Sequence, residues 1–223
     1  MSCAEPPLPP DVLIEIWSDV ICPFCYLGRR NLEQALDGFE RRDEVEVVWR
    51  SFELDPTSSP DPQGPLVDAL AKKYGMSREQ AVASQEQIAA ASEAVGLTFN
   101  WEQAQPVNTF DAHRLIHLAA KHGLGSEADE RLKRAYFSDG EVVSDHETLV
   151  RLGADIGLPE DEVREMLGSD QFADAVRGDE AQAQQIGVSG VPFTVLDRRL
   201  AVSGAQPPEV FTQALQQAFA ESA

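Results

Sequence analysis

The chain has 223 residues, of which 43% are hydrophobic and 25% are charged, and its formal net charge at pH 7 is −20. This length predicts one core with a large insertion rather than two average domains. A negative charge of this size repels phosphate backbones and anionic lipids, so binding to nucleic acid or to a membrane surface is not expected. Three cysteines are too few for a secreted scaffold held together by disulfides.

The N-terminal sequence MSCAEPPLPP has neither the positive charge nor the apolar stretch of a secretory signal. We expect residues 1–10, which include Cys3, to form a flexible tail. No stretch of the sequence approaches the roughly 18 apolar residues of a membrane span. The expected compartment is therefore the cytoplasm, where most thiols are held reduced.

The first 54 residues predict a strand, a helix and a second strand. Residues 11–19, DVLIEIWSD, are short, apolar and rich in β-branched side chains, as buried strands are. Apolar residues then recur at helical spacing after Pro23, and a proline suits the first position of a helix. Residues 44–54 alternate like a strand, and the Pro- and Asp-rich residues 55–65 predict a loop.

Residues 65–187 carry almost only helical patterns, and most of these segments end at glycine. Ser77 with Gln80, and Ser144 with Glu147, predict capping boxes at two of the helix starts.

Two strands, 191–197 and 198–205, and a final helix, 207–223, follow. This order predicts an α/β thioredoxin-like fold with a large all-helical insertion. The predicted divisions are a discontinuous thioredoxin-like domain at residues 11–62 and 180–223, and an inserted helical domain at residues 63–179.

Cys22 and Cys25 form a C-x-x-C between the first predicted strand and the first predicted helix. Cys22 would lie at the helix N-terminus, where unpaired N–H groups and the helix dipole stabilise a thiolate. Cys25, one turn later, could resolve a mixed disulfide formed on Cys22. Pro23 would rigidify the turn, and Phe24 would offer an apolar face to a substrate.

Two alternatives for this pair remain open at this point. The cysteines could be inert core thiols, although their place between a strand and a helix argues against that. A structural zinc site would need four ligands, and the other candidates are Cys3 and four scattered histidines. His113 and His117 are spaced by four on a predicted helix, a spacing more often found on an ordinary amphipathic face.

The stretch GVSGVPFTV places Pro192 at the start of a predicted strand. A proline there belongs at the entrance of the strand or carries a cis bond. A simple turn proline is the alternative.

The sequence resembles the DsbA-like thioredoxin-fold family and, within it, the FrnE-type cytosolic oxidoreductases. The stretches that carry the resemblance are IWSDVICPFCYLGRRNLEQAL, NTFDAHRLIHLAAKHG, LKRAYFSDGEVVSDHETLV and GVSGVPFTVLDRRLAVSGAQPPEVFTQAL. The family's CPxC matches Cys22–Cys25, and its cis-proline matches Pro192. The resemblance implies a disulfide oxidoreductase with a helical cap over the site, in which the backbone of Val191 pairs with an extended substrate.

The sequence departs from that family in two ways. A Pro-Phe dipeptide separates the cysteines, where strongly oxidising periplasmic members have Pro-His, and this favours a less oxidising potential. Some FrnE-type members add a further cysteine pair, which this sequence lacks. The role of Cys3 stays open.

Four other residues are candidate supporting residues. Trp17 could form a wall of the site, although core packing is the favoured interpretation. Asp19 could tune proton transfer to Cys25, or could serve only as a cap. Asn108 and His113 could face the site and shape a substrate groove, or Asn108 could simply cap a helix.

We therefore predict a thiol–disulfide oxidoreductase that reduces, forms or isomerises disulfides in protein or small-thiol substrates. It would need no cofactor and no metal, only an external donor or acceptor such as glutathione. One alternative is a glutathione-dependent isomerase of small aromatic compounds, like the 2-hydroxychromene-2-carboxylate isomerases, which typically carry serine in place of Cys22. The other is a redox-linked holdase chaperone. The oligomeric state is open between monomer and homodimer.

Overall fold

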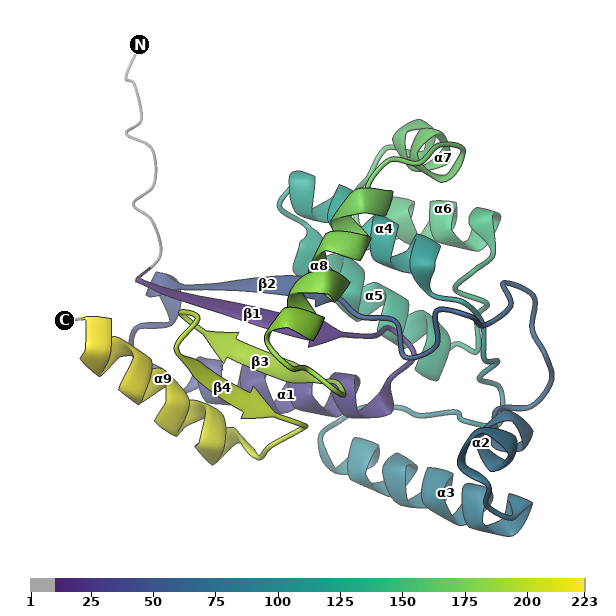
Figure 1. Cartoon of the computed structure of the whole chain (residues 1–223), viewed down its shortest axis with the longest axis horizontal. Coiled ribbons are helices and arrows are strands. Elements are labelled where there is room, and N and C mark those ends of the chain that lie inside the picture. Colours follow the sequence, from purple (N-terminus) through teal and green to yellow (C-terminus); the bar gives the residue numbers. More distant parts are fainter. Residues whose placement is uncertain (1–10, 223) are drawn as a thin grey trace.

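The computed structural model describes residues 11–222, and Figure 1 shows a small sheet with helices packed beside it and at one end. The elements in chain order are β1 (Val12–Ser18), α1 (Pro23–Asp37), the 3-10 helix η1 (Arg42–Glu44), β2 (Val45–Ser51), α2 (Leu66–Tyr74), α3 (Arg78–Ala94), α4 (Phe110–Lys121), α5 (Gly125–Phe137), α6 (His146–Asp155), α7 (Glu160–Leu167), α8 (Ala173–Gln185), β3 (Phe193–Leu196), β4 (Leu200–Ser203) and α9 (Pro208–Ser222). The predicted tail, residues 1–10 with Cys3, lies outside the described residues.

In the described part of the chain, the strands form one mixed sheet in the order β2-β1-β3-β4. β1 pairs parallel with β2 and antiparallel with β3, and β4 pairs antiparallel with β3. The chain leaves the sheet after β2, forms α2 to α8 and re-enters the sheet at β3, which confirms the predicted fold class (Figure 1). The predicted boundary between residues 179 and 180 falls inside α8, and the exact division into domains stays a prediction.

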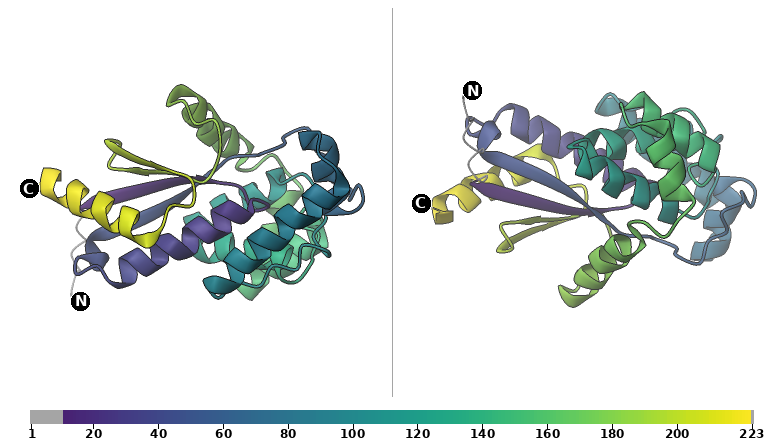
Figure 2. Two further views of the ribbon diagram at one scale, coloured as in Figure 1. Left: turned by 90° about the horizontal axis from the view of Figure 1, so that it is seen from below. Right: turned by 90° about the horizontal axis from the view of Figure 1, so that it is seen from above.

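β1 lies at the centre of the sheet and is buried on both faces. Ile14 and Ile16 belong to the main core with residues of α1 and α9, whereas Trp17 packs with Ala183 of α8 in a second core. Successive side chains of a strand point to opposite faces, so one strand supplies both cores. Figure 2 shows α1 and α9 against one face of the sheet and α8 against the other.

The inserted helices α4 to α7 pack on one another around buried leucines, among them Leu115, Leu132 and Leu149. α5 also packs against β2 and α1, which ties these helices to the sheet, and α2 and α3 form a separate pair beside the start of α1. None of the helices formed by residues 11–222 is long and apolar enough to cross a membrane.

The two predicted capping boxes have different outcomes. At the start of α3, Ser77 and Gln80 each accept a backbone hydrogen bond from the other, which confirms the first box. The second was wrong, because α6 is capped by Asp145, whose carboxylate accepts from the Thr148 N–H at 2.8 Å. The hydroxyl of Ser144 instead donates to the carbonyl of Pro60 in a distant loop, so it does not cap α6.

Candidate active site

Cys22 and Cys25 lie where the central strand β1 passes into α1. Cys22 has an extended backbone and is the residue immediately before the helix, and Pro23 is the first helical residue. The N–H groups of Cys25 and Tyr26 donate to the Cys22 carbonyl at 3.1 and 3.3 Å. Both thiols are free, and the two residues are only 3% and 1% exposed. The structure therefore places Cys22 at the helix N-terminus and Cys25 one turn inside.

The two thiols have opposite proton affinities. A hydrogen bond from the Cys25 side chain lowers the pKa of Cys22, and the backbone N–H groups of Cys25 and Phe24 lower it further, against burial and the charge of Asp19. Burial raises the pKa of Cys25 well above its ordinary value, and the hydrogen bond and charge of Cys22 add to this. A thiol with a low pKa is the attacking group in disulfide exchange, so this asymmetry assigns attack to Cys22 and resolution to Cys25.

The loop before β3 lies against this pair. The Val191–Pro192 peptide bond is cis, the isomer that the family resemblance implies. The Cys22 thiol donates to the Val191 carbonyl, with a distance of 3.6 Å from Sγ to oxygen. The Pro192 carbonyl accepts from the Gly204 N–H at 2.8 Å, which holds the loop to the segment after β4.

Gly28 lets this loop approach α1, and sequence reasoning did not single it out. A Cβ atom at this position would lie 3.0 Å from Cγ of Pro192 and 3.4 Å from Cα of Ala205. That separation is tighter than an ordinary van der Waals contact. The signal available in the sequence was a glycine inside a predicted helix, six residues after Cys22, where glycine lowers helix stability.

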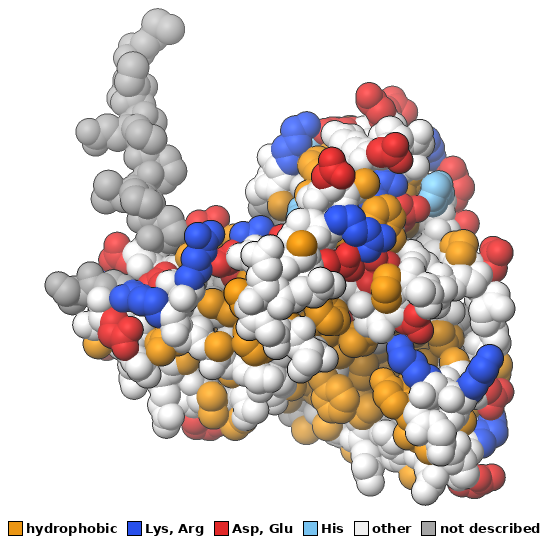
Figure 3. Space-filling view, in the orientation of Figure 1, with side chains coloured by type: hydrophobic (Ala, Val, Ile, Leu, Met, Phe, Trp, Pro, Cys, Tyr) orange, Lys and Arg blue, Asp and Glu red, His pale blue; other side chains and the backbone are white. Residues whose placement is uncertain are grey.

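An exposed apolar side chain, Phe24, lies between the two cysteines in the chain. Phe24 is 50% exposed, and Leu54 and Ile186 are exposed as well. Figure 3 shows hydrophobic side chains gathered between α8 and the α2–α3 pair, the region in which Figure 1 places the start of α1. This surface is suited to an apolar segment of a substrate.

Trp17 is buried, and its indole N–H donates to the Asp179 carbonyl at 2.9 Å. Its contacts with Ala183, Val188 and Val195 make it a core residue on the α8 face of the sheet. This packing agrees with the interpretation of Trp17 as a core residue.

Asp19 and His113 lie together behind the cysteines. Both are buried, and Oδ1 of Asp19 is 3.4 Å from Nε2 of His113. The other carboxylate oxygen of Asp19 accepts from the Leu54 N–H at 2.7 Å, and its backbone carbonyl accepts from the Cys22 N–H at 3.2 Å. A buried acid in contact with a histidine is chemically suited to proton movement, and the role of Asp19 in proton transfer to Cys25 stays a prediction.

Asn108 contacts the site indirectly, through an acid that sequence reasoning missed. Its side-chain amide donates to the buried carboxylate of Glu53 at 3.1 Å, and its Oδ1 accepts from the Phe110 N–H at 2.9 Å, at the start of α4. Burial raises the pKa of Glu53, while its ion pair with Arg177 lowers it. Asn108 therefore accepts from the first N–H group of α4 and links the loop after β2 to that helix. Apolar and polar residues alternate around Glu53 as they do at the end of any strand, so nothing in the local sequence marked Glu53 as a residue near the site.

His117 points elsewhere. Its Nε2 lies 3.1 Å from the Ser51 hydroxyl and 3.2 Å from Asp179 Oδ2. The structure thus separates the roles of the two histidines that are spaced by four on α4, since only His113 reaches Asp19.

Fold and site together define a thioredoxin-like protein with a helical insertion and a dithiol at a helix N-terminus. Residues 13–216 match the family described as DSBA-like thioredoxin domain, so the chain belongs to that family.

Comparison with individual proteins agrees with this assignment. The chain is similar to the probable DsbA oxidoreductase SCO1869 of Streptomyces coelicolor, with 48% identity, a TM-score of 0.90 and coverage of 94% of this chain and 91% of that chain. It is 28% identical to YwbO of Bacillus subtilis, a protein described as uncharacterized, over 92% of this chain and 96% of YwbO. The cytosolic disulfide reductase DsbM of Pseudomonas aeruginosa, in its structure with GSH, shares the fold alone, with 17% identity, a TM-score of 0.65 and coverage of 92% and 98%.

Proposed function

We propose that this protein is a thiol–disulfide oxidoreductase whose reactive group is the Cys22–Cys25 dithiol. The observation that carries the proposal is the opposite effect of the site on the two thiols, which lowers the pKa of Cys22 and raises that of Cys25. The Cys22 thiolate attacks one sulfur of a substrate disulfide and displaces the other as a thiolate. Cys25 then loses its proton and attacks Cys22, which releases the second substrate thiolate and leaves an enzyme disulfide. The substrate gains two electrons and the enzyme loses two; the reverse sequence forms a substrate disulfide.

The substrates would be extended peptides or small thiols and disulfides. The Val191 carbonyl, which accepts from Cys22, belongs to the loop in which Val191 would pair with a substrate backbone. Exposed Phe24 supports binding of apolar substrate groups. No cofactor is required, because an external thiol can exchange electrons with the dithiol. Glutathione is a candidate, since the related-fold reductase DsbM was solved with GSH and is described as cytosolic. The cytoplasm is the proposed compartment on the same basis, and the FrnE-type subgroup is proposed from the sequence stretches that carry the resemblance.

The first test is a reduction potential, measured by equilibrating the protein with glutathione buffers and alkylating the remaining free thiols. We expect one reversible two-electron transition in wild type and none in Cys22→Ser. A value near the thioredoxin level of roughly −270 mV would indicate a reductant, and one near the DsbA level of roughly −120 mV an oxidant. The absence of any transition over this range would refute the proposal.

The two rival functions make different predictions for the same variants. A glutathione-dependent isomerase would keep its activity in Cys22→Ser, because relatives with that activity typically carry serine there. A holdase chaperone would suppress aggregation after loss of both cysteines, through apolar surface such as that around Phe24. The oxidoreductase requires both cysteines for turnover.

A further inference from the structure

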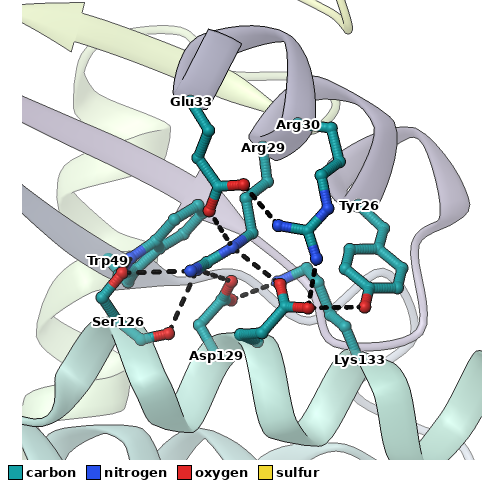
Figure 4. A network of polar contacts seen from close by, with 9 residues as sticks. Tyr26, Arg29, Arg30, Glu33, Trp49, Ser126, Asp129 and Lys133 are labelled. Carbon is teal, nitrogen blue, oxygen red and sulfur yellow. Dashed lines mark hydrogen bonds and ion pairs between the residues drawn. The ribbon is translucent and has the colours of Figure 1, made fainter. Parts of the chain in front are cut away.

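A lysine is buried between the redox helix and the inserted helices. Lys133 on α5 is 0% exposed, and its ammonium group forms an ion pair with Asp129, which is 1% exposed. Arg29 of α1 approaches the same carboxylate, with Nη1 3.0 Å from Oδ2. Figure 4 shows the Arg29 and Lys133 side chains converging on Asp129 from the two helices. Burying a lysine ammonium group costs free energy of desolvation, which pairing with an acid only partly offsets. A functional role for the charge would explain why it is kept.

The packing of α1 against α5 brings Lys133 to the level of Cys25. Arg29 contacts the first turns of α5, where its Nη1 donates to the Ser126 carbonyl at 3.1 Å. Tyr26, one turn earlier on α1, stacks on Phe137 at the end of α5, with ring centroids 5.9 Å apart. The two helices therefore run in opposite directions. Cys25 precedes Arg29 by one turn, so it faces the turn of α5 that carries Lys133.

Three cations, Arg29, Arg30 and Lys133, and three acids make up this cluster, and Lys133 is its most deeply buried cation. Asp129 is shared between two cations, Lys133 and Arg29. The other acids, Glu33 and Glu130, lie at the more exposed edge and pair with Arg29 and with Arg30. The remaining side of Lys133 is covered by the ring of Trp49, with Nζ 5.1 Å from its centroid.

We propose that Lys133 is a positioning residue for the resolving step, and that its ammonium group supplies the buried positive charge that the Cys25 thiolate needs when it forms. This inference rests on the proposed function. In that step Cys25 gives its proton to solvent, attacks Sγ of Cys22 in the mixed disulfide and forms the Cys22–Cys25 bond, while the substrate sulfur leaves as a thiolate and takes up a proton. Lys133 stays protonated throughout and acts only through its charge.

The titration of Cys25 agrees with this geometry. Burial raises the pKa of Cys25, and the hydrogen bond and charge of Cys22 on α1 raise it further. The charge of Lys133 on α5 and a backbone hydrogen bond from Asp19 in the loop after β1 lower it. A buried thiol that must ionise to react therefore has a cation on the neighbouring helix α5 that favours its thiolate.

The test separates the two exchange steps with dithiodipyridine, an uncharged disulfide that releases one coloured thiopyridone at each step. Every variant carries Cys3→Ser, so that only the pair reacts. The first phase reports attack by Cys22, and the second reports resolution by Cys25; Cys25→Ser should show the first phase alone. We compare Lys133→Gln, which removes the charge but keeps a donor for Asp129, with Lys133→Arg, which keeps the charge.

We expect Lys133→Gln to leave the first phase unchanged and to slow the second. A neighbouring opposite charge typically shifts a pKa by about one unit or more, and one unit sets the scale expected here. Loss of this charge should reduce the thiolate fraction of Cys25 about tenfold at neutral pH. A thiolate with a higher pKa is also a stronger nucleophile, by about threefold here, so the second phase should slow about threefold in all. Its pH profile should move upward by about one unit. Lys133→Arg should stay within about twofold of wild type.

Three results would overturn the inference: a second phase of Lys133→Gln at the wild-type rate, an equal slowing by the Gln and Arg variants, or a slower rate without a shifted pH profile. The last two would assign Lys133 a packing role only. If thermal unfolding shows that Lys133→Gln does not fold, Lys133→Met, which removes the charge and leaves Asp129 paired with Arg29, takes its place with the same criteria. The absence of a second phase in the Cys3→Ser parent would instead contradict the proposed function.

Discussion

At the scale of single residues, Cys22 and Cys25 are chemically identical side chains with different surroundings. Cys22 lies before the first turn of α1 and receives hydrogen bonds from Cys25 and from backbone N–H groups, which favour its thiolate. Cys25 lies inside the helix, where burial favours its thiol. The difference depends on one helical turn of separation, which the C-x-x-C spacing supplies.

This asymmetry predicts the pH dependence of alkylation in the reduced protein. Cys22 should react with iodoacetamide with a midpoint below that of an ordinary thiol, because its folded-state pKa is lowered. Cys25 should stay unreactive until well above that pH, because its pKa is raised. Mass spectrometry of peptides after timed alkylation measures both. Equal midpoints, or earlier reaction of Cys25, would contradict the assignment of their roles.

At the scale of elements, the contact of α1 with the Pro192 loop depends on Gly28, and a matched pair of variants tests it. Glycine inside a helix costs about 0.5–1 kcal/mol relative to alanine. Gly178 in α8 has no atom within 4 Å of a Cβ at its position, so Gly178→Ala should stabilise the protein by about that amount. Gly28→Ala places its methyl group 3.0 Å from Pro192, and such overpacking costs about 1–3 kcal/mol.

We therefore expect opposite signs for the two substitutions in the free energy of unfolding measured in urea. Gly28→Ala should also slow the reaction of Cys22 with dithiodipyridine, because displacement of the loop moves the Val191 carbonyl that contacts the thiol. Stabilisation of both variants by the same amount would show that the close approach to Pro192 carries no energetic consequence.

The elements also show which parts of the structure were accessible from the sequence. The hydrophobic run of β1 and the proline after Cys22 are local signals, and they located the strand, the helix start and the redox pair. The connection between β3 and β4, residues 197–199, lies at the predicted boundary between the two strands, and Asp197 and Arg198 in it have positive φ.

Other features depend on contacts between distant segments and had no local signal. Arg29 and Asp129 are 100 positions apart, as are Arg30 and Glu130, and only the packing of α1 on α5 joins them. The cap of α6 shows the same limit at short range. Ser144 and Asp145 are both good capping residues, and the choice between them followed from the contact of Ser144 with the Pro60 loop.

At the scale of the whole molecule, the charge of −20 acts on every substrate that approaches the site. The chain has 38 acidic and 18 basic residues, so an anionic disulfide meets a repulsive potential before it reaches Cys22. Salt screens this repulsion, because the Debye length falls from about 30 Å at 0.01 M to about 10 Å at 0.1 M ionic strength. The rate of attack should therefore depend on both the charge of the substrate and the salt concentration.

Oxidised glutathione, an anion, and hydroxyethyl disulfide, which is uncharged, form a suitable pair of substrates. We expect the second-order rate constant of the reduced protein with oxidised glutathione to rise severalfold between these two ionic strengths, because the repulsion extends over the longer screening length at low salt. The rate constant with hydroxyethyl disulfide should change little. Parallel salt dependence for both would mean that salt acts on the protein itself. A fall in the glutathione rate would reveal a local positive potential at the site, strong enough to outweigh the net charge of the chain.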